Sequence, residues 1–297
     1  MKKHRATIIL FILPCVLSLF VMYLYPVVRT VIMSFFSIES VTAPARSWTF
    51  NGLANYISLF TSSAFLTALW NMVRIWLLGG VVTLALALLF AVILCSGVRF
   101  KKFFRAAIYL PNIISAVALA TMWIQYVFNY DFGLLNGILK EFGVSNVKWL
   151  GTDMKFWSML IAYIFGATGY FMLIFISGIE RIPADLYEAS TIDGAGKVRQ
   201  FFSITMPLLK GITKTNITFW TITTTSFFLW SKMFSPVSSE NSTLVPVIYI
   251  YDRVFGTASN TTRNAGLGAA AGVFLSVVVL LVYILLEKVI KNDDLEF

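Results

Sequence analysis

The chain has 297 residues, of which 58% are hydrophobic and 12% are charged, and its formal net charge is +9. Soluble domains have about 25% charged residues, so this composition could not cover a globule of this size with solvated side chains. The basic residues lie in short runs between apolar segments, which is typical of membrane topology and not of nucleic-acid binding. The composition therefore predicts an all-α integral membrane protein.

Six segments are apolar enough to cross a bilayer, which requires about 20 mostly apolar residues. In chain order they are 7–29, 69–95, 105–128, 156–180, 212–231 and 266–288. The first follows a basic start, but it is longer than the roughly 7–15 apolar residues of a secretory signal, so we expect a retained anchor. No composition break indicates a second domain, and we expect residues 1–297 to form a single transmembrane domain.

The lysine and arginine residues predict the orientation of these spans. With the N-terminus inside, the inner connections hold more of them than the outer connections 30–68, 129–155 and 232–265, although the outer ones are longer. Positive residues are enriched in cytoplasmic connections. We therefore expect both termini to be cytoplasmic.

Few residues offer metal or catalytic chemistry. Cys15 and Cys95 both lie inside apolar runs, and His4 is the single histidine, so we expect no metal site and no cofactor. The chain lacks a G-x-x-x-x-G-K-[ST] phosphate-binding loop. Its spans also lack the paired carboxylates of a proton-coupled carrier or membrane enzyme. An enzyme or a channel is therefore disfavoured, and energy for any transport must come from a partner.

The connection 181–211 lies on the cytoplasmic side in this topology. Pro183 suits the first turn of a helix, and we expect that helix to run to about Ile192 and end at Asp193-Gly194. A second helical stretch should stop near Pro207. Leu186, Ala189 and Ser190 share one face of the first helix, where small residues let another protein approach the backbone.

This connection resembles the EAA loop of bacterial ABC import permeases. The family pattern is E-A-A, three residues, G, nine residues and I-x-L-P. The chain has the following residues at that spacing: Glu188, Ala189, Ser190, Gly194, Ile204, Met206 and Pro207. Ser190 replaces an alanine and Met206 replaces a leucine. Further stretches, including Phe50–Tyr56 and Gly133–Asn136, are similar to the carbohydrate-uptake branch with its maltose-type and oligosaccharide permeases.

The resemblance implies an ABC importer type I permease fold in the bacterial inner (cytoplasmic) membrane. It implies an importer of a sugar or oligosaccharide in which this chain forms half of the translocation pathway. The implied partners are a second homologous permease, a cytoplasmic ATPase dimer that binds the ATP, and an extracytoplasmic solute-binding protein. The residues implied in coupling to the ATPase are Glu188, Ala189, Ser190, Asp193, Gly194 and Pro207. A non-sugar solute (a polyol, a glycerol phosphate ester or an amino acid) is the alternative.

Candidate substrate contacts come from the fourth and fifth spans, where polar residues lie at bilayer depth. Asn216, Trp220, Thr224 and Phe227 fall on one helix face, and Tyr170 lies at similar depth in the fourth span. Aromatic rings stack on the CH faces of sugars, while amides and hydroxyls pair with sugar hydroxyls. Helix packing is the alternative, because small and polar residues are common between membrane helices.

Overall fold

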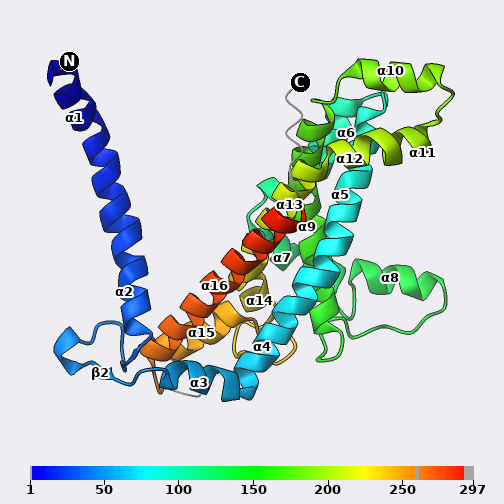
Figure 1. The fold of residues 1–297 in the computed structure, drawn as a ribbon. Helices are drawn as coiled ribbons and strands as arrows, with labels where there is room; N and C mark the ends of the chain where they lie inside the picture. Colours follow the sequence, from blue (N-terminus) through cyan, green and yellow to red (C-terminus); the bar gives the residue numbers. More distant parts are fainter. Residues whose placement is uncertain (1, 258–260, 291–297) are drawn as a thin grey trace. The chain divides into compact units, whose positions relative to one another are not determined.

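The computed structural model describes residues 2–257 and 261–290, and these are mostly helical (Figure 1). They fall into two compact units, one within Met1–Leu66 and Tyr249–Val277 and the other within Thr67–Ile248 and Val278–Phe297. The first unit contains α1 Lys2–Leu19, α2 Tyr25–Met33, β1 Phe36–Ser37, β2 Thr49–Phe50 and α3 Ala54–Thr61. The second contains α5 Gly80–Cys95, α6 Lys101–Ile113, α7 Ala116–Met122, α8 Leu134–Glu141, α9 Lys155–Ile179, α10 Ala184–Ile192, α11 Lys197–Gln200, α12 Met206–Leu208, α13 Lys210–Thr225 and α14 Phe228–Phe234. The residues of α4 Ser63–Arg74, α15 Pro246–Phe255 and α16 Ala265–Val289 are divided between the two units.

Four helical stretches of the described chain are long and apolar enough to cross a membrane. They are Leu10–Met33, Ser63–Cys95, Lys155–Ile179 and Ala265–Val289. The pair α6 and α7 makes a fifth candidate, bent by 98° where Ile114 and Ser115 are extended. The all-α membrane fold is confirmed, whereas the expected count of six is not. The cytoplasmic position of the termini stays a prediction, and residues 291–297 lie outside the described part of the chain.

The expected span 212–231 is not one helix. It is divided into α13 and α14, which are separated by Ser226 and Phe227. At about 1.5 Å per residue, the 16 residues of α13 cover roughly 24 Å, less than the roughly 30 Å hydrocarbon core. Thr225 ends α13, and its hydroxyl donates back to the carbonyls of Thr221 and Ile222. Such back-bonding favours helix bending and termination, which agrees with the break.

Helix α9 is the central element of the second unit. It packs along α5 and α6 and also contacts α13 and α14 (Figure 1). Glycines make the close approaches possible: a Cβ on Gly169 would collide with the α6 backbone at Ile108 and Tyr109, and one on Gly166 would lie 2.9 Å from Leu119 Cδ2. Helix α9 therefore packs against the other long helices of the unit and leads directly into the loop that contains α10.

The first unit has a small core of its own. The strands β1 and β2 pair antiparallel, with Phe36 opposite Phe50. The amide of Asn55 donates to the carbonyls of Ser34 and Phe36, each at 2.9 Å, and so connects α3 to the start of β1 and to the turn before it. The core itself comprises Met33, Ile38, Ala265 and Ala269, with Phe36, Ala43 and Trp48 packed against it.

Candidate functional site

The connection after α9 forms two helical segments joined by a tight turn. Pro183 precedes α10 and Asp185 lies in its first turn, where a negative charge complements the helix dipole. Gly194 follows the helix with φ +78°, a left-handed conformation that glycine adopts without steric cost. The second segment runs from α11 through a π-helical turn, Phe201–Thr205, into α12, which ends one residue beyond Pro207. The turn thus lies where Asp193-Gly194 predicts it.

The buried side chain of Gln200, in α11, holds the two segments together by hydrogen bonds to α10. Its side-chain nitrogen donates to the Tyr187 carbonyl at 3.2 Å and to the hydroxyls of Ser190 and Thr191, both at 2.9 Å. The residue is buried, with 3% of its surface exposed. A second bond of 2.9 Å joins the hydroxyls of Tyr187 and Thr205. The loop is therefore a folded, internally bonded unit.

The residues predicted to couple to an ATPase divide between the surface and the interior of this loop. Glu188, Ala189, Asp193, Gly194 and Pro207 are exposed. Ser190 is half-buried, and its hydroxyl donates to the Tyr187 carbonyl and accepts from Gln200. Its hydroxyl therefore helps to hold the loop in shape, while its place on the docking face stays a prediction.

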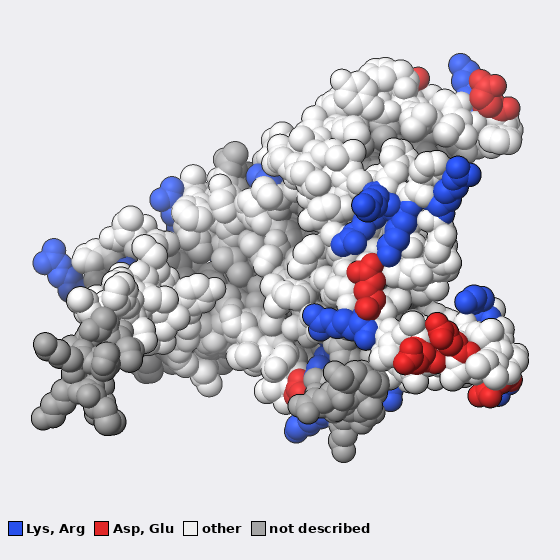
Figure 2. Space-filling view, turned by 90° about the horizontal axis from the view of Figure 1, so that it is seen from above, with Lys and Arg blue, Asp and Glu red and all other residues white. Residues whose placement is uncertain are grey.

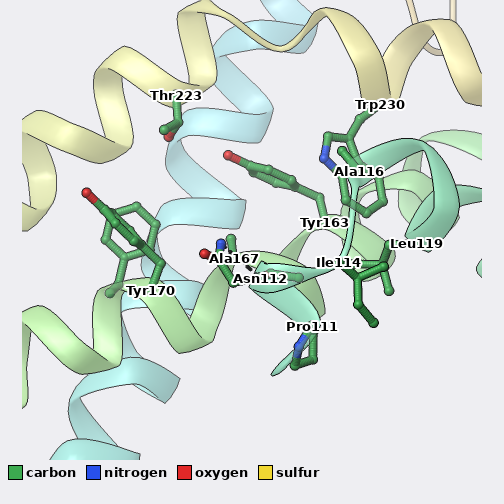
Figure 3. Close-up of a pocket in the computed structure, with 12 residues that line it drawn as sticks. Pro111, Asn112, Ile114, Ala116, Leu119, Tyr163, Ala167, Tyr170, Thr223 and Trp230 are labelled. Carbon is green, nitrogen blue, oxygen red and sulfur yellow. Dashed lines mark hydrogen bonds between the residues drawn. The ribbon is translucent and has the colours of Figure 1, made fainter. Parts of the chain in front are cut away.

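A cavity of about 220 Å³ lies beside the break between α6 and α7 (Figure 3). Its polar side chains come from four helices, α6, α9, α13 and α14. They are Asn112, Tyr163, Tyr170, Thr223 and Trp230. Apolar residues, among them Ile114, Leu119 and Phe171, complete the wall.

Of the five predicted substrate contacts, the structure brings only Tyr170 to this cavity. The cavity also involves Tyr163 and Thr223, which the sequence analysis does not select, and Asn112, which lies two residues before the break at Ile114. In the sequence, the indication of a break here is Pro111, which lies three residues before Ile114-Ser115 inside an apolar span. The lining contains two phenols, a threonine hydroxyl, an amide and an indole, and no Lys, Arg, Asp or Glu. This chemistry suits a neutral, hydroxyl-rich solute.

The other four predicted contacts lie in the packed interior of the second unit. Trp220 is 1% exposed, and its indole nitrogen donates to the Trp76 carbonyl at 2.8 Å. The Phe227 ring packs edge-on against Tyr163, with ring centroids 4.6 Å apart. Asn216 and Thr224 are also buried, and neither side chain has a hydrogen-bond partner among the described residues. The predicted face exists, but it points into the helix bundle.

Charged residues gather at the end of the second unit that carries α10 (Figure 2). Lys101 and Glu180 form an ion pair of 2.8 Å between the start of α6 and the end of α9. The hydrogen bond from Lys101 lowers the pKa of the Glu180 carboxyl from its usual value. Within the described residues, no group of three or more His, Cys, Asp or Glu side chains is arranged to hold a metal ion.

Comparison with known proteins gives consistent matches. Residues 83–292 match the family described as binding-protein-dependent transport system inner membrane component. The chain is 32% identical over 293 residues to the arabinooligosaccharides transport system permease protein AraP of Bacillus subtilis, covering 96% of this chain and 89% of that protein. It is 34% identical over 209 residues to the trehalose/maltose transport system permease protein MalF of Thermococcus litoralis, covering 68% of each. A solved bacterial ABC transporter involved in the import of the acidic polysaccharide alginate shares the fold, with a TM-score of 0.83 at 19% identity over 98% of this chain and 97% of that one.

Proposed function

The chain belongs to the family of inner membrane components of binding-protein-dependent transport systems, and we propose that it forms half of the pathway by which an ATP-driven importer takes up a sugar or oligosaccharide. As a member of this family it is an integral membrane permease subunit. The proposal concerns the solute, the path it follows and the partners that supply energy and specificity.

The cavity at the α6–α7 break carries the proposal for a sugar. It combines aromatic surfaces from Tyr163, Tyr170 and Trp230 with the Asn112 amide and the Thr223 hydroxyl. Relatives named for arabinooligosaccharides and for trehalose and maltose agree with this solute class. Its 220 Å³ is below the roughly 300–1,000 Å³ of pockets that enclose a whole small ligand. The size supports a shared path to which a second permease contributes the remaining wall.

A charged solute such as a glycerol phosphate ester or an amino acid fits the cavity less well. Phosphate and carboxylate groups are recognised by Arg, Lys or clustered backbone N–H donors. The cavity lining includes none of the charged side chains that would serve this purpose. A neutral polyol shares the hydroxyl chemistry of a sugar, and a transport panel separates these two.

Coupling to a cytoplasmic ATPase dimer is proposed for the α10 loop. Glu188, Ala189, Asp193 and Gly194 are exposed on it, and this agrees with a role in docking. Gln200 holds the loop in one shape, which a docking element requires because an ordered surface loses less entropy on binding. In this assignment the ATPase binds the ATP and the loop lies on the cytoplasmic side.

The exposed first helices agree with assembly into a larger complex. In Leu10–Met33 the most apolar window has none of its residues buried by the chain itself. Lipid and a second homologous permease are the proposed neighbours of this surface. An extracytoplasmic solute-binding protein is the proposed source of the sugar.

Uptake by the reconstituted complex tests the proposal. The complex would be purified with its copurifying partners, placed in proteoliposomes with ATP, and offered labelled oligosaccharides, a polyol, glycerol 3-phosphate and an amino acid. We expect sugar uptake, a loss of at least about tenfold in Tyr170→Ala, corresponding to roughly 1.4 kcal/mol, and no loss in Tyr126→Ala, whose exposed ring is outside the cavity.

A charge reversal tests the coupling separately. Glu188→Lys should abolish copurification of the ATPase, while Tyr170→Ala should keep it. Uptake of a charged solute in preference to sugars would refute the solute class. Recovery of the chain without an ATPase would refute the coupling.

A further inference from the structure

A surface at the start of α6 combines unpaired positive charge with exposed aromatic rings. We call it the basic–aromatic patch and define it by Arg99, Phe100, Lys102, Phe103 and Arg105. Phe100 and Phe103 are 68% and 67% exposed. Arg99 and Lys102 are exposed and Arg105 is half-buried. None of the three cations is within ion-pair distance of a described acidic residue, although the charge of Arg105 also acts on Glu180, which pairs with Lys101.

The backbone at the patch adopts a sterically costly conformation. Phe100 has φ +64°, and no other described residue except glycine has a positive φ. A bulky side chain in this left-handed region is a genuine outlier, and such strain is concentrated at functional positions. The Phe100 carbonyl accepts hydrogen bonds from the N–H groups of Phe103 and Phe104, so the turn starts α6. It sets this ring beside the Arg99 guanidinium, which lies 5.3 Å from the ring centroid.

The position of the patch agrees with the level at which a membrane helix leaves the hydrocarbon. From the first turn of α6 the chain continues through Ile108 and Tyr109, which pack against Gly169 of α9, to the cavity-lining Pro111. Preceding it, α5 is a largely apolar helix that ends at Cys95. Charges at such a boundary lie beside lipid headgroups, and neighbouring rings can enter the acyl region.

We propose that the basic–aromatic patch binds the phosphate headgroups of acidic phospholipids. Lys and Arg clusters next to a membrane helix attract anionic lipid, with about a fivefold gain in binding for each cation. Charge complementarity selects this ligand over zwitterionic lipid. Phe100 and Phe103 would lie beside the glycerol and upper acyl groups and so hold the lipid next to the cations.

Native mass spectrometry of the full-length chain in detergent tests the proposal. The protein would be titrated with phosphatidylglycerol and with phosphatidylcholine of the same acyl chains. We expect at least about tenfold tighter binding of phosphatidylglycerol, and loss of that preference in the triple variant R99Q/K102Q/R105Q. The matched control, R46Q/K140Q/K148Q, removes the same charge from exposed positions outside the patch and should keep the preference.

Each contrary outcome has a distinct meaning. Equal binding of the two lipids, or an equal loss of preference in both triple variants, overturns the proposal. Displacement of the lipid by glycerol phosphate at equal concentration would show that phosphate alone is the ligand and also overturns it. A patch variant that keeps its lipid preference but loses a copurifying ATPase would mark a protein interface instead. Melting temperatures of both variants would verify that each remains folded.

Discussion

Gln200→Met should loosen the α10 loop without disturbing the membrane helices. The side-chain nitrogen of Gln200 has two hydrogens, and three acceptors lie within 3.2 Å of it. Methionine has nearly the same length and donates nothing, so packing is conserved while the bonds are lost. At about 1 kcal/mol for each net hydrogen bond, the loss is about 2 kcal/mol. This corresponds to roughly thirtyfold more frequent opening of the loop.

Hydrogen–deuterium exchange of the full-length protein measures this opening directly. Amides in α10 and α11 should exchange about ten- to thirtyfold faster in the variant, since local opening controls their exchange. Amides in the middle of α9 should be unchanged, because Gln200 makes none of its hydrogen bonds there. The matched control is Arg199→Met, which changes the exposed neighbouring residue.

The reasoning fails if Gln200→Met exchanges like the natural protein in α10, or if Arg199→Met accelerates exchange equally. Faster exchange throughout α9 would also contradict it, because the loop would then not be an independent structural unit. In the assembled importer, the loosened loop should lower ATP-driven uptake more than it lowers ATP hydrolysis.

Five further substitutions test the packing and the ion pairs by thermal unfolding in detergent. Gly80→Ala should cost about 1–3 kcal/mol, because the new Cβ would lie 2.6 Å from the nitrogen of a buried indole ring, whereas Gly272→Ala, with nothing within 4 Å, should cost nothing. Glu287→Gln leaves the largely buried Lys214 ammonium without its partner, whereas Lys214→Met leaves only the half-exposed Glu287 carboxylate without one. We therefore expect Glu287→Gln to lower the free energy of unfolding by about 1–2 kcal/mol more than Lys214→Met does. Glu180→Gln removes a largely exposed ion pair and should change the free energy of unfolding by less than about 1 kcal/mol; a larger loss would show that this pair is effectively buried.

Local features of the α10 loop could be predicted because they depend on neighbouring residues. Pro183 and Gly194 impose backbone angles that limit α10 at its two ends. The internal bonding of the loop could not be predicted, since Gln200 bonds residues nine to thirteen positions earlier and its polarity alone indicates a surface position. Glu188 lies on the same helix and is exposed.

Periodicity could identify the polar face of the fifth expected span but not the environment that this face meets. Asn216, Trp220 and Thr224 do share a face of α13. In the structure that face is buried, and Gly80 of α5 provides the space that the Trp220 ring fills. A buried helix face and a solute path have the same repeat, so only the neighbouring helices distinguish them. Gly80, the first residue of α5, is therefore what allows this face to pack closely against α5.

The two ends of the α10 loop pack against each other, and the helices that meet there also line the cavity. A Cβ on Gly178, near the end of α9, would lie 2.8 Å from Leu209 and 2.6 Å from Ile212, so α9 and the start of α13 touch where the loop begins and ends. A displacement of the loop must therefore move both helices together, since a close-packed contact transmits strain. Tyr170 of α9 and Thr223 of α13 line the same cavity. If α10 is the docking element and the cavity lies on the solute path, as proposed above, a force on α10 would reach the cavity as a joint movement of these two helices against the α6–α7 break, where the backbone leaves the helical conformation at Ile114.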